Sequence, residues 1–106
     1  MPLPEITHLQ YLVLALLLDG EQSGKALREK MAEHGVKKGG PAFYQMMGRL
    51  EDGRYVHGSY DQKVIDGQII KERRYRIMVN GVKACEEVRE FYLANERGVR
   101  KGLAHA

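Results

Sequence analysis

Positively charged side chains are concentrated in the middle of the sequence. Residues 37–80 hold nine of the 17 lysines and arginines against five acidic residues, a net charge of +4. Residues 1–36 carry −2 and the remainder carries +1, which gives the +3 of the whole chain. Ammonium and guanidinium groups gathered on one part of a surface attract polyanions. The distribution therefore indicates a polyanion-binding surface, although proteins that bind no polyanion also carry surfaces of this charge.

The segment from Pro41 to Asp52 combines an apolar stripe with polar side chains. Phe43, Met47 and Leu50 follow helical spacing and are expected to face a core. The set expected to face outward is then Ala42, Gln45, Met46 and Arg49. In a DNA major groove, alanine can touch a thymine methyl, glutamine can pair with adenine, and arginine can reach guanine or a phosphate. The same pattern fits an ordinary amphipathic helix with a solvated face, so it decides nothing alone.

A basic loop precedes this segment. Lys37 and Lys38 are followed by Gly39-Gly40, and Pro41 stands at the first helical position, where its fixed φ favours a helix start. The free N–H groups at a helix start favour a phosphate, and the two lysines would add charge to that contact. We therefore count Lys37, Lys38 and Pro41 among the expected contacts to a nucleic acid.

A second basic group lies on a predicted hairpin. Lys63 is in its connection, and the returning strand carries Lys71, Arg73, Arg74 and Arg76. Basic side chains on such a hairpin would follow a phosphate backbone or an adjacent minor groove. An alternative is a solvated edge strand that is charged to discourage aggregation, and both interpretations can hold together.

The residues that enzymes and metal sites require are missing, are not suitably spaced, or have another expected role. His8, His34, His57 and His105 are scattered, without metal-ligand spacing. The single cysteine, Cys85, falls in an apolar stripe, where a small buried side chain is the expected role. We expect no catalytic activity, no metal and no cofactor. One cysteine cannot form an intramolecular disulfide, and the apolar run from Tyr11 to Leu18 is too short to cross a bilayer, so we expect a cytoplasmic protein without a membrane partner.

Local signals place these residues on a definite order of elements. Thr7 and Gln10 form a capping box before a helix over 8–18, which Asp19-Gly20 ends. Ser23 caps a second helix over 24–33, and a third runs over 41–52. Strands are predicted over 55–60 and 69–77, joined by an eight-residue connection with Asp66-Gly67 as the turn. A last helix begins near Asn80.

This order predicts a fold that is mainly α with a small β hairpin, the winged helix-turn-helix. Its three-helix core and two-stranded wing would form a DNA-binding domain over residues 1–78, with the third helix as the reader. Residues 79–95 would form a C-terminal dimerisation helix, and residues 96–106 a disordered tail.

The first and last helices carry more apolar side chains than one buried face can cover, which predicts a homodimer. The expected interface residues are Leu9, Leu12, Leu16, Val88, Phe91 and Tyr92.

Several segments together resemble the PadR family of bacterial transcriptional regulators. Residues 43–53, Phe-Tyr-Gln-Met-Met-Gly-Arg-Leu-Glu-Asp-Gly, are similar to the family's Leu-Tyr-x-x-Leu-x-x-Leu-Glu-x-x-Gly pattern. Residues 73–77 resemble its returning strand, Gly81 stands where the next helix usually has a glycine, and the likeness covers residues 6–93. The resemblance implies a homodimeric winged-helix repressor, with the last helix on the partner's first helix and Tyr44 near the DNA backbone. Gly48 within the third helix, Met78 in place of a capping threonine, and the absence of tryptophan depart from the pattern.

The sequence thus predicts a regulator that binds double-stranded DNA sequence-specifically as a homodimer on a pseudo-palindromic operator. The alternative is a winged-helix module that binds proteins and no DNA. A small-molecule effector is compatible with either, but the sequence assigns it no residues.

Overall fold

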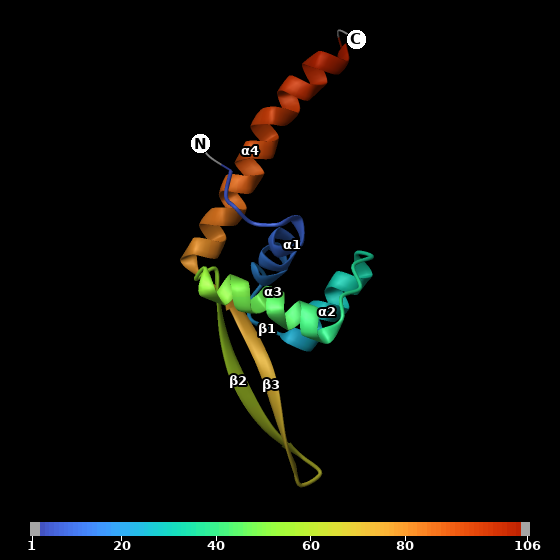
Figure 1. The fold of residues 1–106 in the computed structure, drawn as a ribbon, viewed down its shortest axis with the longest axis vertical. Helices are drawn as coiled ribbons and strands as arrows, with labels where there is room; N and C mark the ends of the chain where they lie inside the picture. The colour runs from blue at the N-terminus through green and yellow to red at the C-terminus, as the bar shows by residue number, and fades with distance from the viewer. Residues whose placement is uncertain (1–2, 105–106) are drawn as a thin grey trace.

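The computed structural model describes residues 3–104 of the chain, with the side chains of residues 3–96. Its elements are α1 (His8–Leu17), β1 (Gln22–Ser23), α2 (Gly24–Glu33), α3 (Gly40–Asp52), β2 (Val56–Ile65), β3 (Gln68–Ile77) and α4 (Val79–Ala104). In Figure 1 the first three helices gather in the middle, the hairpin β2–β3 projects at one end, and α4 projects at the other. The predicted winged-helix fold class is confirmed.

The predicted helix starts are formed by the expected side chains. Thr7 Oγ1 accepts from the Gln10 N–H at 3.1 Å, and the Thr7 N–H donates to Gln10 Oε1 at 2.8 Å. Ser23 Oγ accepts from the Ala26 N–H at 3.0 Å and so caps α2. Gly39 is the cap residue of α3, with Pro41 in the first turn. Thr7 and Ser23 satisfy N–H groups that would otherwise lack a partner inside the helix, whereas Gly39 makes no side-chain cap hydrogen bond.

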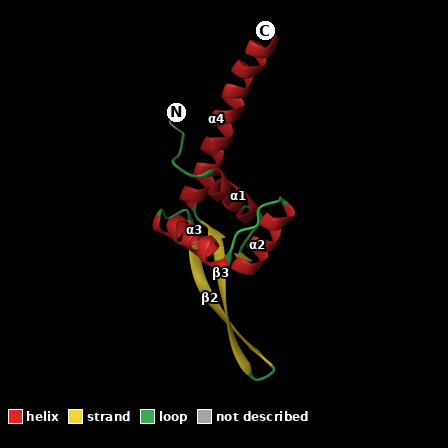
Figure 2. Ribbon diagram, turned by 45° about the vertical axis from the view of Figure 1, so that its right-hand side comes forward, coloured by secondary structure: helices red, strands yellow, loops and turns green. Residues whose placement is uncertain are grey.

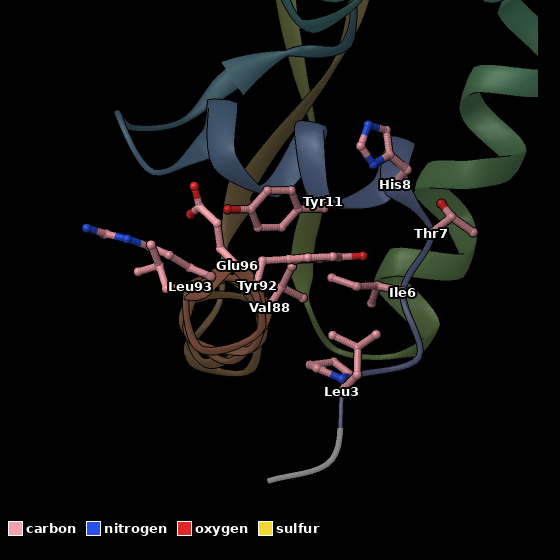
Figure 3. A pocket seen from close by; sticks show the side chains of 11 residues that line it. Leu3, Ile6, Thr7, His8, Tyr11, Val88, Tyr92, Leu93 and Glu96 are labelled. Carbon is pink, nitrogen blue, oxygen red and sulfur yellow. The ribbon is translucent and has the colours of Figure 1, made fainter. Parts of the chain in front are cut away.

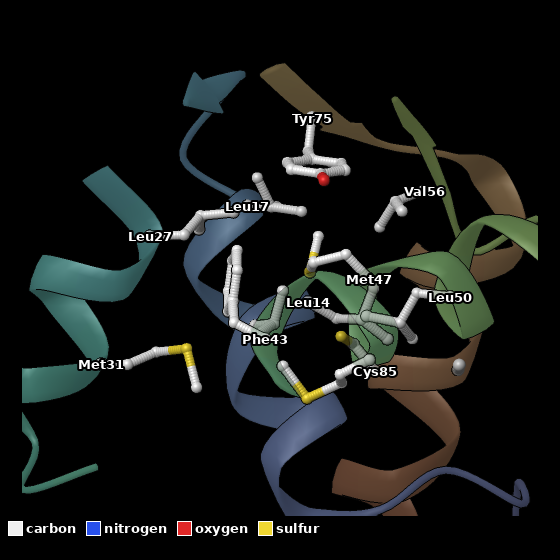
Figure 4. Close-up of a cluster of buried hydrophobic side chains, with 13 residues drawn as sticks. Leu14, Leu17, Leu27, Met31, Phe43, Met47, Leu50, Val56, Tyr75 and Cys85 are labelled. Atoms are coloured by element: carbon white, nitrogen blue, oxygen red, sulfur yellow. The ribbon is translucent and has the colours of Figure 1, made fainter. Parts of the chain in front are cut away.

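The core lies where the three short helices, the base of the hairpin and the start of α4 meet (Figure 4). Phe43, Met47 and Leu50 of α3 are buried in it, as their spacing predicted. They pack with side chains from every other long element, among them Leu14, Leu17, Leu27, Val56, Tyr75 and Cys85. Burial raises the pKa of the Cys85 thiol, with a further contribution from Glu86, so Cys85 has the buried role expected for it.

The expected outward position of Met46 is wrong. Its side chain is 7% exposed and belongs to the core. With 3.6 residues per turn, positions 43, 46, 47 and 50 form one stripe, so the buried face of α3 is wider than the three residues first assigned to it.

The hairpin is longer and its turn is tighter than predicted. β2 and β3 pair from Val56 opposite Ile77 to Ile65 opposite Gln68. The predicted eight-residue connection is therefore wrong, and only Asp66-Gly67 joins the strands. Asp66 and Gly67 have φ of 51° and 77°, and left-handed conformations at both turn residues match the twist of the flanking strands. Figure 2 shows the two strands leaving the helices as one ribbon.

A short strand that the sequence did not predict completes the sheet. β1 pairs with β3, Gln22 opposite Tyr75 and Ser23 opposite Arg74, which gives the antiparallel order β1-β3-β2. Two residues show no alternation that a pattern search would detect. This pairing attaches the wing to the start of α2.

The last helix is also longer than expected. α4 runs through Ala104 rather than ending at residue 95 before a tail. At 1.5 Å per residue, its 26 residues span about 39 Å. Ala84, Cys85 and Val88 on its first half are buried. Residues 105–106 of the expected tail lie outside the described residues.

Two helical glycines provide a matched stability test. A Cβ at Gly81 would overlap the Tyr55 carbonyl oxygen and lie 2.7 Å from Ile77 Cγ1, whereas a Cβ at Gly48 would meet nothing within 4 Å. We expect Gly48→Ala to raise the free energy of unfolding by up to about 1 kcal/mol. Gly81→Ala should lower it by about 1–3 kcal/mol through overpacking. Urea denaturation measures both, and changes of the same sign would contradict the packing described here.

Candidate nucleic-acid interface

On the outer side of α3, residues that the sequence predicted to contact a nucleic acid are exposed to solvent. Pro41, Ala42, Gln45 and Arg49 are all exposed. Tyr44 is 41% exposed, and the inner side of its ring packs against the protein. Its ring meets Phe43 edge-on at 5.0 Å and lies over Gly24, where a Cβ would be 2.8 Å from the Tyr44 hydroxyl oxygen. The glycine that opens α2 therefore lets Tyr44 pack against α2 while the rest of the ring faces outward.

Beside the start of α3 lies an open basic hollow of about 500 Å³. Lys25 and Arg28 of α2 line it together with Lys37 and Lys38 of the loop. Arg28 Nη2 donates to the Lys38 carbonyl oxygen at 3.2 Å and so ties the loop to α2. The sequence prediction grouped the two loop lysines and assigned no role to Lys25 and Arg28. Their approach to the loop depends on how α2 packs, which residue spacing does not reveal.

One face of the wing carries a chain of ion pairs. Lys63 Nζ lies 3.4 Å from Glu72 Oε2, and Arg74 lies 3.7 Å from Glu72 and 3.5 Å from Glu21. The Lys63 side chain is 54% exposed, and an exposed pair of this kind contributes only about 0–1 kcal/mol. Lys63 is thus held weakly, whereas Arg74 links β3 to the body beside β1.

The opposite face of the wing is joined to α3 through Arg73. Its Nη2 donates to Glu51 Oε1 of α3. The guanidinium also lies 4.6 Å from the ring centroid of Tyr60 and 5.6 Å from that of Tyr75. Burial disfavours the charge of Arg73, but a hydrogen bond with Tyr75 and the nearby Glu51 carboxylate outweigh it and raise the pKa. We call Glu51, Gly58, Tyr60, Arg73 and Tyr75 the wing root.

Gly58 makes this contact possible. It stands opposite Tyr75 in the sheet. A Cβ there would overlap the Glu51 carboxylate and lie 2.7 Å from Arg73 Nη2. The carboxylate therefore rests directly on the backbone of β2. The sequence predicted a phosphate contact for Arg73 and no role for Glu51. The contact between these two side chains depends on the strand register, so the sequence pattern did not reveal it.

A hollow of about 460 Å³ lies between α3 and this face of the wing. Tyr44 and Glu51 line it from α3, and Tyr60, Lys71, Arg73 and Tyr75 line it from the hairpin. The structure thus brings together three of the expected contact residues, Tyr44, Lys71 and Arg73. Lys63 lies on the other face of the hairpin, because residues alternate along a strand.

A mostly apolar groove of about 490 Å³ separates the N-terminal segment and α1 from α4 (Figure 3). Ile6 and Tyr11 line one side, and Val88, Tyr92 and Leu93 line the other. Val88 is buried within the chain, whereas Tyr92 is 60% and Leu93 53% exposed. The other residues expected at a dimer interface, Leu9, Leu12, Leu16 and Phe91, are half-buried.

Comparison with solved structures identifies the fold. A PadR family transcriptional regulator from Eggerthella lenta is 27% identical, with a TM-score of 0.72 over 90% of this chain and 80% of that one. A PadR family transcription regulator from Clostridium difficile is 13% identical, with a TM-score of 0.76 over 92% of this chain and 99% of that one. The chain therefore has the winged-helix fold of these PadR family regulators. Bacillus subtilis PadR in complex with operator DNA is also similar, with 20% identity and a TM-score of 0.61 over 76% of this chain and 45% of that one.

No family model and no curated protein matches the sequence. The similarity to PadR family regulators therefore rests on the structural likeness and on the resemblance of residues 43–53 and 73–77. Within the part of the chain that the structure describes, no group of three or more His, Cys, Asp or Glu side chains is placed to hold a metal ion. None of the described helices is long and apolar enough to cross a membrane.

The wing root gives a stability prediction. Arg73→Ala should lower the free energy of unfolding by about 1.5–3 kcal/mol, the range for hydrogen bonds to charged groups. Arg76→Ala, an exposed arginine of the same strand, should change it by less than about 0.5 kcal/mol. Denaturation of Arg73→Ala, Glu51→Gln and the double variant measures the coupling between the two side chains. Additive effects of the two substitutions would contradict the contact.

Proposed function

We propose that this PadR-like chain is a transcriptional regulator that binds double-stranded DNA in a sequence-specific manner. The observation that carries the proposal is the shared hollow of α3 and the wing, lined by Tyr44, Tyr60, Lys71 and Arg73. A helix with exposed polar side chains and a hairpin beside it suit adjacent grooves of one duplex. The alternative, a winged helix that binds only proteins, is not favoured, because the similar structures are regulators and one of them was solved with operator DNA.

The contacts divide into two groups with different roles. Ala42, Gln45 and Arg49, which are exposed on α3, would meet base edges. Phosphates would be met by Lys25, Arg28, Lys37 and Lys38 beside the start of α3, and by Lys71 on the wing. Arg73 is engaged by Glu51, so its main role is to position the wing. A role on DNA also agrees with the cytoplasmic location expected from the sequence.

We further propose that the chain acts as a homodimer through α4 and the groove beside it. Tyr92 and Leu93 expose apolar surface there, and the second half of α4 extends away from the body (Figure 1). A two-fold axis through this region would present two α3 helices to successive major grooves about 34 Å apart. A pseudo-palindromic operator follows from that symmetry, and repression follows where it overlaps a promoter.

Base and phosphate contacts are separable by mutation. Gln45→Ala and Arg49→Ala should each reduce discrimination at one operator position by about 1–3 kcal/mol. Lys71→Ala should weaken binding to all sequences and lower the slope of log affinity against log salt by about one. Lys83→Ala, an exposed lysine of α4, is the charge-matched control. Selection from a random duplex pool followed by titration at several salt concentrations measures both effects, and wild-type failure to bind any duplex at low salt would refute the proposal.

The dimer is tested by light scattering at micromolar concentration. We expect a mass of two chains for the wild type and of one chain for Tyr92→Glu, because the substitution places a carboxylate in an apolar contact. Lys83→Glu, also exposed on α4, should remain dimeric. A monomeric wild type would contradict the proposal.

A further inference from the structure

The hollow between α3 and the wing carries one cation that the fold leaves unpaired. Lys71 lines the hollow and is exposed, and within the described residues it has no ion-pair partner. Arg73, the other cation of the hollow, is bound to the Glu51 carboxylate, so this pair adds no net charge. The lining of the hollow therefore carries one net positive charge, that of Lys71.

Two tyrosine hydroxyl groups add neutral donors to the hollow. Tyr44 of α3 is 41% exposed and Tyr60 of β2 is 69% exposed. Among the described residues, neither hydroxyl group has a hydrogen-bond partner. Tyr75, the third tyrosine of the lining, is only 2% exposed and belongs to the core. The free donors are thus one ammonium group and two hydroxyl groups, a set that suits an anion with one negative charge and more than one oxygen.

The ring of Tyr60 is held in place by Arg73. The two residues stand opposite each other in the hairpin, and the guanidinium lies 4.6 Å from the ring centroid. Glu51 of α3 in turn accepts a hydrogen bond from this guanidinium. An exposed side chain loses conformational entropy when it binds a ligand, and this contact restricts the ring of Tyr60 beforehand. The fold therefore orders Tyr60 although it leaves the hydroxyl group free.

We propose that this hollow binds one phosphate of the DNA backbone and that Tyr60 is one of its donors. Lys71 and Tyr44 are the other two donors, whereas Arg73 is a positioning residue that acts through Tyr60 and contacts no phosphate. The inference rests on the proposed DNA-binding function and adds a contact that the sequence did not predict. α3 and the wing suit adjacent grooves of one duplex, and one sugar–phosphate backbone separates such grooves. That backbone would pass between the two elements, where the hollow lies.

A phosphodiester suits the charge of the hollow better than a free phosphate compound does. A phosphodiester has one negative charge, which equals the single net positive charge of the lining. A terminal phosphate group carries about −1.5 to −2 at pH 7. The Glu51 carboxylate also lines the hollow and would repel the additional charge. The charge balance therefore favours the backbone of a nucleic acid as the source of the phosphate.

Removal of a single hydroxyl group tests the contact. Tyr60→Phe keeps the ring beside Arg73 and should weaken binding to the selected operator about three- to tenfold. The slope of log affinity against log salt should stay unchanged, because a neutral donor releases no counterion, whereas Lys71→Ala should lower it by about one. Tyr55→Phe is the matched control, because Tyr55 packs on Gly53 outside the hollow, and it should bind as the wild type does.

Operators with one methylphosphonate linkage identify the phosphate, since each such linkage removes one backbone charge. At one linkage of each half-site the wild type should lose affinity. There the effect of Tyr60→Phe should fall to about twofold or less, because a hydrogen bond to a neutral acceptor is weaker. This coupling would assign the occupant to DNA rather than to a free phosphate compound. An unchanged effect of Tyr60→Phe at every linkage would overturn the proposal and leave the DNA-binding function standing.

The positioning role of Arg73 is tested by replacing both charges of its pair. Glu51→Gln combined with Arg73→Met leaves neither charge unpaired, and a methionine side chain packs well on aromatic rings. We expect binding to weaken about threefold with an unchanged salt slope, and no such loss in the Tyr60→Phe background.

Two results would overturn the positioning role. A salt slope lower by about one would show that Arg73 itself contacts a phosphate, and a loss that persists in the Tyr60→Phe background would show that the pair does not act through Tyr60. A wild type that binds no duplex at low salt would overturn this proposal together with the proposed function.

Discussion

The contact between Glu51 and Arg73 is the constraint on which the candidate interface depends. It joins the last turn of α3 to the middle of β3 through two half-buried charges. Taking one charge out of water without the other is costly, so neither side chain leaves the site easily. Tyr60 and Tyr75 flank the guanidinium, and Gly58 lets the carboxylate reach it. This polar contact consequently stabilises the direction of the wing relative to α3, in addition to the core packing of Val56 and Tyr75.

Glycine is used in this structure to bring elements into direct contact. At Gly58 a side chain lies on a strand backbone, at Gly24 a tyrosine ring lies on the start of α2, and at Gly81 the first turn of α4 lies on a carbonyl group and on Ile77. Each of these sites joins two elements that differ in type or direction. Gly48 has no such neighbour, so packing within the chain does not explain why a glycine stands at this position.

The sequence predicted the features that depend on neighbours along the chain. Thr7, Gln10 and Ser23 act within one helical turn, and Phe43, Met47 and Leu50 lie on one stripe, so helix starts and core positions were foreseeable. The strands of the wing were predicted too short because Asp61, Gln62 and Lys63 suggested a loop. Cross-strand pairing instead extends the strands through these residues to Asp66-Gly67. Met46 was assigned to the wrong side because the buried stripe is wide. The pairing of Glu51 with Arg73 depends on residues 22 positions apart, and no local pattern encodes it.

The length of the molecule has a mechanical consequence. It measures 67 Å along its longest axis, with α4 at one end and the turn of the β2–β3 hairpin at the other (Figure 1). A rigid body of this shape acts as a lever, so a rotation of a few degrees near α4 displaces the turn of the hairpin by several ångströms. In the proposed complex, alignment with a fixed spacing of DNA contacts would therefore depend on the packing around two glycines, Gly81 at the base of α4 and Gly58 at the base of the hairpin. A change in the packing at either glycine would alter which spacings are tolerated without altering any side chain proposed to touch DNA.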